Sequence, residues 1–552
     1  MEPKICLQRV LCVFTAGPTT KGESLVRVRE IDKLKYQSGM VLRIGILIFA
    51  MFFLLLLRAV EAHKDEEQDE EQDEEQDEQD DYHVREINFV DDLGAIPENT
   101  TLAAKAINRE LLSNALNGLE EGNCFVVPNQ TFHTLGGIVV ETELKNVKIV
   151  LAGTLKFDRH RELWPRDEDG NILDALQFQG LESVTLTSTS GLSDRGTLNG
   201  QGRYWWDLTN INDNRPKLLS ILSARDVTLE KWAFIDSPFW SCSIFGADGL
   251  TVRHCDAITT VARYRPDSHG LLYRFFHWIC IWFVTRFRFS TFLSRLPAYS
   301  AINTDGFDFQ GSNVHGHDLY MATGDDAIAV KGSSSHMLFE RLRVESGLGL
   351  AIGSVTTDTV QNITFRDAVV LNSMKGIYVK TNWHDGAAGE GASISDILYE
   401  NITIVEALQF SIWIGPAAQL GNEDTCSLRW PQFRDSQCIM APAHSLRNIT
   451  LRSVLVVDPY FSPGVLLGNQ SNPMTQLRFQ NVNVVSWRSG NGQVDPSLRP
   501  WGLTFYCTGV SESYAEDSHP SPACFSTDSD VAQYASMALG GLVVSLAVVT
   551  LL

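Results

Sequence analysis

Short segments in which apolar and polar residues alternate recur along the chain from about Val140 to Val485. Such alternation is typical of a β-strand with one buried face. Neighbouring segments often start 23 to 28 residues apart, Gly, Asn and Asp punctuate them, and long helical periods are rare. The segments are VTLEKWAFID (227–236), LTVRHCDAI (250–258), MLFERLRVES (337–346), ITFRDAVVLNS (363–373), ILYENITIVEA (397–407), ITLRSVLVVD (449–458) and LRFQNVNVVS (477–486).

This array of short strands predicts a solenoid, because one coil cannot bury its inward face alone and stacking buries it. A β-sandwich would need hairpin turns about every 8–12 residues and would leave the repeat unexplained. We therefore predict an all-β protein with the fold of a right-handed parallel β-helix. The segment TTLAAKAINRELLSNAL (100–116) is the one helix that we expect, and it could cap the open end of the solenoid.

The composition is that of a globular protein with a large core: 44% of the 552 residues are hydrophobic, with 41 Gly and 12 Trp. The net charge of −22 comes largely from one tract, Asp65–Asp81, which holds thirteen acidic residues and no basic ones. We expect this tract to be a solvated spacer. The rest of the chain has no basic stripe with interleaved aromatic residues, which argues against a nucleic-acid partner.

The stretch MVLRIGILIFAMFFLLLLRAVEA resembles a secretory signal that begins at Met40: Arg43 precedes an apolar run, and Val60 and Ala62 suit cleavage. The residues before Met40 are either an unusual leader or lie upstream of the true start, and we favour the second reading. An uncleaved signal anchor is the alternative. We assign residues 1–62 to leader and signal peptide and residues 63–83 to the acidic spacer.

The last part of the chain, residues 526–552, combines a small polar patch (Ser526–Asp530), a spacer and the apolar run MALGGLVVSLAVVTLL. This order resembles a signal for attachment of a glycosylphosphatidylinositol (GPI) anchor. A short membrane anchor and a buried final strand are the alternatives. We expect an extracellular, secreted monomer that meets a membrane only through such an anchor.

Secretion permits disulfides and glycosylation. Of the ten cysteines, the close pairs Cys426/Cys438 and Cys507/Cys524 are the predicted bridges, whereas Cys242 and Cys255 could pair or remain buried thiols. We expect no cofactor and no metal, since the Cys and His spacing gives no zinc site. The six glycosylation sequons are at Asn99, Asn129, Asn362, Asn401, Asn448 and Asn469.

Two acidic motifs carry the candidate chemistry: NTDGFD (303–308) and GDDAIAVK (324–331). If they lie one coil apart, about 4.8 Å, then Asp305, Asp325 and Asp326 meet on one outer face. Repulsion between like charges would raise the pKa of at least one carboxyl, so that one could donate a proton while the others stay ionised. Glycoside hydrolysis needs this division of labour, although an Asp-Asp pair alone is more often a turn or a calcium site.

In chain order, NTDGFD, GDDAIAVK, SGLGLAIGS (346–354) and GIYVKTN (376–382) resemble the four signature segments of glycoside hydrolase family 28, the polygalacturonase family. The resemblance covers about residues 84–525 and implies a parallel β-helix that hydrolyses α-1,4-galacturonosyl linkages of pectin with inversion. By position, Asp325 matches the general acid, and Asp305 and Asp326 match the carboxylates that activate water. Lys380 matches the lysine that holds the substrate carboxylate, and Asn303 is a further candidate for substrate binding.

The chain departs from the family pattern at two places: Leu348 stands where a histidine is usual, and Tyr378 where an arginine is usual. Leucine cannot form a side-chain hydrogen bond. Tyrosine could stack on a sugar, and so remains a substrate-binding candidate, but cannot bind a uronate as a bidentate ion pair. These departures indicate a divergent subgroup that could prefer another galacturonide, a chain end or branched pectin.

Three other functions stay open. A rhamnogalacturonan hydrolase would use the same carboxylates. A non-catalytic pectin-binding surface protein would bind the polysaccharide without cleaving it. A pectate lyase would need calcium and a basic residue that removes a proton.

Four further residues lie near the motifs. Asp267, His269, Trp383 and His384 could line the site, although loop histidines are more often solvated. Trp413 is predicted to pack in the core, since it lies in the apolar segment SIWIGP. The aromatic and basic segment 271–300 contains no acidic residue, and we interpret it as a translated intron, a membrane-interface hairpin or a lid.

Overall fold

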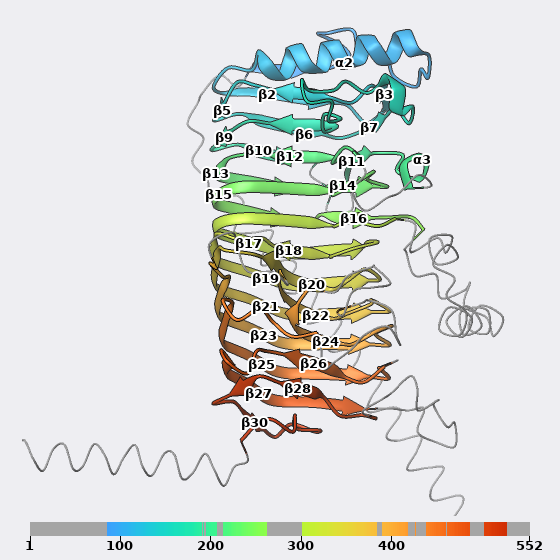
Figure 1. Cartoon of the computed structure of the whole chain (residues 1–552). Coiled ribbons are helices and arrows are strands. Elements are labelled where there is room, and N and C mark those ends of the chain that lie inside the picture. The colour runs from blue at the N-terminus through green and yellow to red at the C-terminus, as the bar shows by residue number, and fades with distance from the viewer. Residues whose placement is uncertain are drawn as a thin grey trace, which may run out of the picture. The chain divides into compact units, whose positions relative to one another are not determined.

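The structure is a computed structural model, and it describes residues 85–526 apart from 190, 192–194, 207–213, 262–300, 383–388, 418–425, 427–437, 460 and 486–501. Over this part the chain winds into stacked coils whose strands pair in parallel with those of the next coil (Figure 1). The prediction of a right-handed parallel β-helix is confirmed.

One column of strands carries the residues of the candidate site, and we name it the site sheet. Each member pairs in register with its neighbour one coil further along. In order along the stack, the site sheet consists of β4 (Ile138–Val140), β8 (Leu176–Phe178), β12 (Leu219–Ile221), β15 (Cys242–Arg253), β17 (Phe307–Ala322), β18 (Ile328–Val330), β20 (Leu350–Val355), β22 (Ile377–Thr381), β24 (Ile412–Pro416), β26 (Gly464–Leu467) and β28 (Tyr506–Thr508).

Two further columns complete the coils, and the long strands β15 and β17 turn a corner from the site sheet into them. One column begins with β3 (Thr131–Thr134), β7 (Thr154–Phe157), β11 (Gly196–Asn199), β14 (Trp232–Ile235) and β16 (Asp256–Ile258). It continues through the last residues of β17 and of the long strands that follow, because β16 pairs with the end of β17 and that end pairs with β19. The other contains β1 (Arg85–Asn88), β2 (Asn123–Val127), β5 (Leu144–Lys145), β6 (Lys148–Leu151), β9 (Leu181–Glu182), β10 (Thr185–Thr187), β13 (Ala224–Glu230), β19 (Ser334–Glu345), β21 (Thr359–Leu371), β23 (Ser393–Val405), β25 (Ser445–Val457), β27 (Met474–Val485), β29 (Val510–Ser511) and β30 (Tyr514–Glu516).

Residues with left-handed backbone conformation mark bends within the long strands. In β17, Asn313 has a φ of 57° and Asp318 a φ of 53°, and Asn362, Asn401 and Asn448 repeat this in later strands. Asn and Asp adopt this conformation more readily than other residues with a Cβ. The Asn and Asp residues that punctuate the sequence are therefore, at these places, bends of the coil.

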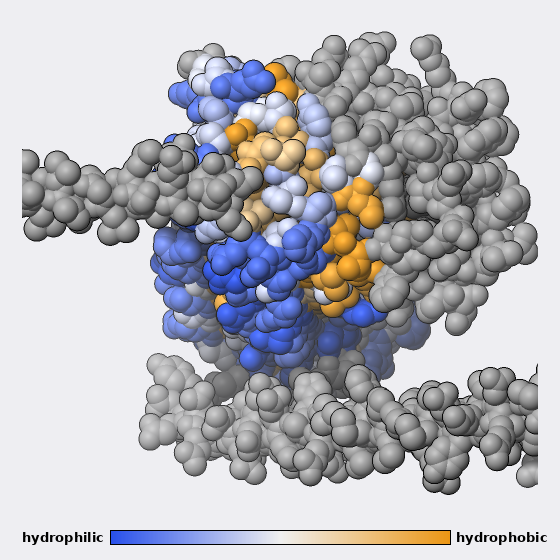
Figure 2. All heavy atoms as spheres, turned by 90° about the horizontal axis from the view of Figure 1, so that it is seen from below, coloured by the Kyte–Doolittle hydropathy of each residue, from blue (hydrophilic) through white to orange (hydrophobic). Residues whose placement is uncertain are grey.

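The inward side chains form one continuous apolar core along the stack. Equivalent residues of successive coils lie about 4.8 Å apart, so aromatic rings can stack lengthwise. The ring centroids of Phe339 and Phe365 are 5.0 Å apart, as are those of Phe365 and Tyr399. Seen from the C-terminal end of the stack, polar side chains cover much of one side and apolar side chains gather beside them (Figure 2).

Helix α2 (Leu102–Asn117) lies across the N-terminal end of the stack (Figure 1), which confirms the predicted cap within two residues at each end. The Thr101 side chain caps it by accepting from the N–H of Ala104, and Leu112 and Leu116 are buried. The short helix α3 (Arg203–Trp206) and the 3-10 turn η1 (Arg161–Leu163) were not predicted from the sequence.

The structure confirms both predicted disulfides, Cys426–Cys438 and Cys507–Cys524. It also answers the open question about Cys242 and Cys255, which are buried free thiols. Burial raises the pKa of Cys255 to about 12, so this thiol stays protonated.

Several predictions fall on residues that the structure does not describe. They concern the signal peptide, the acidic spacer, the segment 271–300, the residues Asp267, His269, Trp383 and His384, and the C-terminal apolar run. Within the described part of the chain, no helix is long and apolar enough to cross a membrane.

Candidate active site

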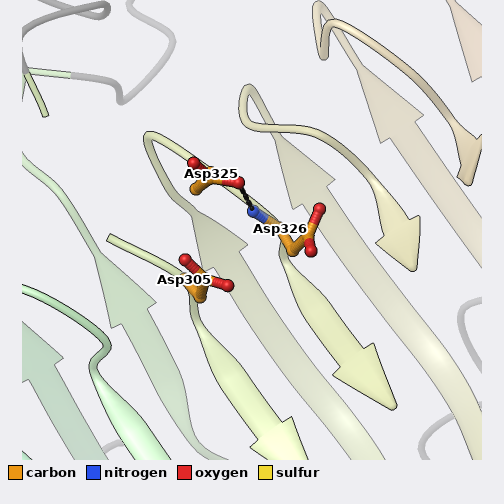
Figure 3. Close-up of side chains that lie close together, drawn as sticks. All are labelled: Asp305, Asp325 and Asp326. Carbon is orange, nitrogen blue, oxygen red and sulfur yellow. Dashed lines mark hydrogen bonds between the residues drawn. The ribbon is translucent and has the colours of Figure 1, made fainter. Parts of the chain in front are cut away.

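The three predicted aspartates lie together where two neighbouring coils enter the site sheet. Asp305 stands two positions before Phe307, the first residue of β17, and Asp326 stands two positions before Ile328, the first residue of β18. Because Phe307 pairs with Ile328, these two aspartates occupy equivalent places on successive coils, and Asp325 lies beside them in the turn. One carboxylate oxygen of each lies within 4.8 Å of the others (Figure 3).

Backbone N–H groups hold the carboxylate of Asp325. The N–H of Asn303 donates to Oδ2 at 3.0 Å, and the N–H of Asp326 donates to Oδ1 at 3.0 Å, the bond drawn in Figure 3. Asn303 reaches this position with a left-handed φ of 57°, which asparagine tolerates. Asn303 therefore contacts Asp325 through its backbone. Its side-chain Oδ1 is buried and has no hydrogen-bond partner among the described residues.

Exposure separates the three carboxylates. Asp305 and Asp326 are 3% and 1% exposed, whereas Asp325 is partly exposed. Asp325 is therefore the one whose oxygens can reach a bound polymer, and the other two lie behind it.

Lys380, in β22, contacts the carboxylate of Asp326, the most buried of the three aspartates. Its Nζ is 2.5 Å from Oδ2 of Asp326 and 4.3 Å from the ring centroid of Tyr378. Burial lowers the pKa of Lys380, but the charges of Asp326, Tyr378 and Asp325 and the hydrogen bond to Asp326 together outweigh it, so the net pKa lies above its ordinary value. The lysine stays cationic and partly neutralises the carboxylates.

A second ion pair, not predicted from the sequence, adjoins the aspartates. Nζ of Lys331 is 2.5 Å from Oδ1 of Asp308 and 3.8 Å from Oδ2 of Asp305. Both residues belong to the two acidic motifs, and alternation signals them: Asp308 stands between the inward residues Phe307 and Phe309 and therefore points outward. Sequence reasoning assigned no role to either.

Burial and mutual repulsion raise the pKa values in this group. Burial, then the charges of Asp308 and Asp325, raise the pKa of Asp305 well above its ordinary range. Burial, then the charge of Asp326, raise the pKa of Asp325 against the opposing effect of Lys380. Burial raises the pKa of Asp308 to about 6, although Lys331 lowers it. Carboxyls held in this way can keep a proton above the pH at which an ordinary aspartate loses it.

Tyr378 corrects a prediction. It was expected as a substrate-binding residue that could stack on a sugar, but it is 1% exposed and packs edge-on against Trp413. Both belong to an apolar cluster on the outside of the site sheet, which holds Ala329, Ala351, Tyr378, Phe410, Trp413, Cys426, Cys438, Phe461, Val465 and Leu467 with Leu348 against it. The predicted burial of Trp413 is confirmed, although in this cluster and not in the central core.

The three carboxylates are also the group of residues that could hold a metal ion among those described. Two lysines already supply positive charge at this place, as Lys380 contacts Asp326 and Lys331 approaches Asp305. The arrangement can do acid–base chemistry without a metal ion: the partly exposed Asp325 can give a proton, Asp326 can take one from a water, and Asp305, whose pKa is raised well above its ordinary range, can orient that water by a hydrogen bond.

Comparison with known proteins agrees with this reading. The sequence profile of glycosyl hydrolases family 28 matches residues 121–416, which include the three aspartates and both lysines that contact them. The chain is 27% identical to endopolygalacturonase I of Aspergillus aculeatus over 237 residues, 42% of this chain and 50% of that protein. It is 25% identical to exopolygalacturonase rpg15 of Rhizopus delemar over 313 residues, 55% of this chain and 67% of that protein.

The alignments thus span from half to about two thirds of these relatives' own length. Among solved structures, a hyperthermoactive exopolygalacturonase from Thermotoga maritima superposes with a TM-score of 0.50 at 16% identity, covering 72% of this chain and 87% of the other, which supports the fold. Because the family profile matches more than half of the sequence, the chain belongs to glycosyl hydrolases family 28.

Proposed function

We propose that the protein hydrolyses α-1,4-galacturonosyl linkages in pectin. The observation that carries the proposal is the group of Asp305, Asp325 and Asp326, whose oxygens lie within 4.8 Å of one another on the outside of the site sheet. Family membership supports a glycosidase, and the matched relatives from Aspergillus aculeatus and Rhizopus delemar are polygalacturonases.

Asp325 is the proposed general acid. It is the partly exposed member of the group, and burial and the charge of Asp326 raise its pKa, which favours the protonated form that the reaction requires. As the glycosidic C–O bond breaks, the Asp325 proton passes to the leaving oxygen. The backbone N–H groups of Asn303 and Asp326 then stabilise the carboxylate that remains.

Asp305 and Asp326 are the proposed partners of the attacking water. The water oxygen bonds to the anomeric carbon and its proton passes to Asp326, which Lys380 contacts, while Asp305, whose raised pKa favours its protonated form, orients the water. Both are almost fully buried, and Lys380 holds Asp326, so they are better placed to hold a water than to bond to a sugar. This argument favours inversion, although the separation is shorter than the roughly 6.5–9.5 Å usual for inverting glycosidases.

Lys380 is the proposed contact for a substrate carboxylate. An ammonium has three N–H donors, and one of them serves Asp326. The remaining donors and the raised pKa suit a uronate that lies beside the scissile bond. In this proposal Asn303 acts through its backbone N–H, which holds the carboxylate of Asp325.

We also propose that the protein is secreted and glycosylated and that a lipid anchor holds it at the cell surface. Exposure of the sequons supports this: Asn129, Asn362 and Asn401 are exposed, and Asn99, Asn448 and Asn469 are partly exposed. The two disulfides suit an oxidising compartment. In this proposal, residues 63–83 separate the signal from the β-helix and residues 526–552 direct the anchor.

The test is release of reducing ends from polygalacturonate and from rhamnogalacturonan by the full-length protein and by Asp325→Asn. Asparagine keeps the shape but cannot donate an acidic proton, so we expect the rate to fall about 10²–10⁴-fold. For the active protein, kcat/KM should decline as the pH rises through the raised pKa of Asp325.

The matched control is Asp91→Asn, an exposed aspartate on the surface, which should keep full activity. Activity in Asp325→Asn equal to that of the unchanged protein would refute the acid role. Calcium-dependent formation of unsaturated products would show a lyase, and binding without cleavage by a folded protein would show a non-catalytic binding function.

A further inference from the structure

Four side chains stand at one position on successive coils, two residues before each strand enters the site sheet. The pairing of Leu219 with Cys242, of Cys242 with Phe307 and of Phe307 with Ile328 sets this register. Counting back two residues from each gives, in order along the stack, Lys217, Trp240, Asp305 and Asp326. Backbone bonds from Leu218 to Trp240 and from Ser241 to Asp305 support the alignment. The two coils before the catalytic aspartates thus present an aromatic ring and a cation.

Aromatic rings hold the Lys217 ammonium in place. Its Nζ lies 5.0 Å from the ring centroid of Trp240 and 5.5 Å from that of Phe245, and these two rings meet edge to face. Phe239 stacks on Trp240 at 5.3 Å and supports it from the turn. A lysine fixed in this way by cation–π contacts loses less conformational freedom when it binds an anion.

The Lys217 ammonium has no carboxylate within ion-pair distance among the residues that the structure describes. The charge of Lys217 lowers the pKa of Asp308, but the Asp308 carboxylate is already paired with Lys331 at 2.5 Å. Lys331 also lies 4.5 Å from the Trp240 ring, so Trp240 connects the unpaired lysine to the carboxylate group. Lys217, Trp240 and Phe245 are all partly exposed, and a ligand can reach them.

We propose that Lys217 and Trp240 form a subsite that binds the carboxylate of a uronosyl residue next to the bond being cleaved. The inference rests on the proposed function, because it takes the polymer to lie across the coils at Asp325. On that path the sugar on the N-terminal side of the aspartates meets Trp240 first and Lys217 one coil further. The Lys217 ammonium binds the sugar carboxylate, and the subsite selects free uronates over methyl-esterified or neutral sugars.

The test measures binding of a galacturonate tetramer to full-length Asp325→Asn, alone and combined with Lys217→Met. Methionine keeps the length of the side chain and removes the charge, and we expect the Kd to rise about tenfold at low salt. Lys217→Arg should restore most of the affinity. Trp240→Leu should weaken binding less than Lys217→Met, since the lysine charge remains. The matched control is Lys148→Met, an exposed lysine of β6, which should leave the Kd unchanged.

The outcomes separate this inference from the proposed function. If Lys217→Met and Trp240→Leu bind the tetramer within about twofold of their parent, the subsite is refuted and the proposed function stands. If Asp325→Asn binds but the unchanged protein cleaves no pectin, the proposed hydrolysis fails while the effect of Lys217→Met still decides the subsite. If the parent binds no galacturonate at all, both are refuted.

Discussion

The two sides of the aspartate group use similar side chains in opposite ways. On the N-terminal side, Lys217 and Trp240 are partly exposed. On the C-terminal side, the same position of the coil holds Leu348 and Lys375, and Lys375 is fully buried between the rings of Tyr378 and Trp413, at 4.6 and 4.9 Å. A lysine near an aromatic ring is thus available to a ligand on one side and enclosed on the other.

This difference in exposure shows that a lysine beside an aromatic ring does not by itself mark a binding surface. The C-terminal side contains the two departures from the family pattern, Leu348 and Tyr378, and both pack in or against the apolar cluster. Where the family usually has a histidine and an arginine, which could bind a sugar through polar contacts, Leu348 and Tyr378 make apolar contacts with this cluster. We therefore expect recognition of the sugar acid to lie on the N-terminal side and at Lys380.

The largest effect that would distinguish the two sides is on stability. Trp413 is fully buried and its indole N–H donates to the carbonyl of Pro416 at 2.8 Å. We expect Trp413→Ala to lower the free energy of unfolding by about 3–5 kcal/mol. Trp240→Ala, on the partly exposed side, should cost about 1 kcal/mol or less. Thermal unfolding of both variants provides the measurement, and equal losses would show that the two sides do not differ.

A smaller effect concerns the two lysines. Burial, then the charge of Lys380, hold the pKa of Lys375 well below its ordinary value, and its Nζ donates to Oε1 of Gln409. Burial of a lysine costs free energy, either to desolvate its charge or to remove its proton, and an apolar side chain of similar size avoids this cost. We expect Lys375→Met to raise the free energy of unfolding by about 1 kcal/mol, whereas Lys217→Met should leave it nearly unchanged.

The pH dependence sharpens this prediction. Between the lowered pKa of folded Lys375 and its unfolded value near 10.5, the unfolded chain binds the extra proton, so the stability of the unchanged protein rises with pH. The advantage of Lys375→Met should therefore shrink as the pH rises toward 10.5. A constant advantage would show that Lys375 does not titrate differently in the folded chain.

The sequence carried enough information for the fold and for the position of the three aspartates. Alternation predicts strands, their spacing predicts coils, and the cap helix follows from the pattern of residues 100–116. Because Asp305 and Asp326 each precede an apolar strand by two positions, stacking brings them together regardless of the intervening turn.

Other parts of the site do not follow from the sequence. Lys217 and Trp240 join the group only once the register of β12, β15 and β17 is known, and segments of varying length between these strands hide that register in the sequence. The burial of Tyr378 was also hidden, because alternation marks it as outward-facing and says nothing of the cluster that covers it. An outward residue on a coil can therefore be either a ligand contact or part of a second core.

The most direct test of the central claim is proton nuclear magnetic resonance of the first products from polygalacturonate. Hydrolysis with inversion at the Asp305, Asp325 and Asp326 group must release reducing ends first as the β-anomer, with the α-anomer appearing later by mutarotation. An α-anomer formed first would show a covalent intermediate, as the short carboxylate separation by itself would suggest. A vinyl proton from an unsaturated product would show elimination, and either result would contradict the account.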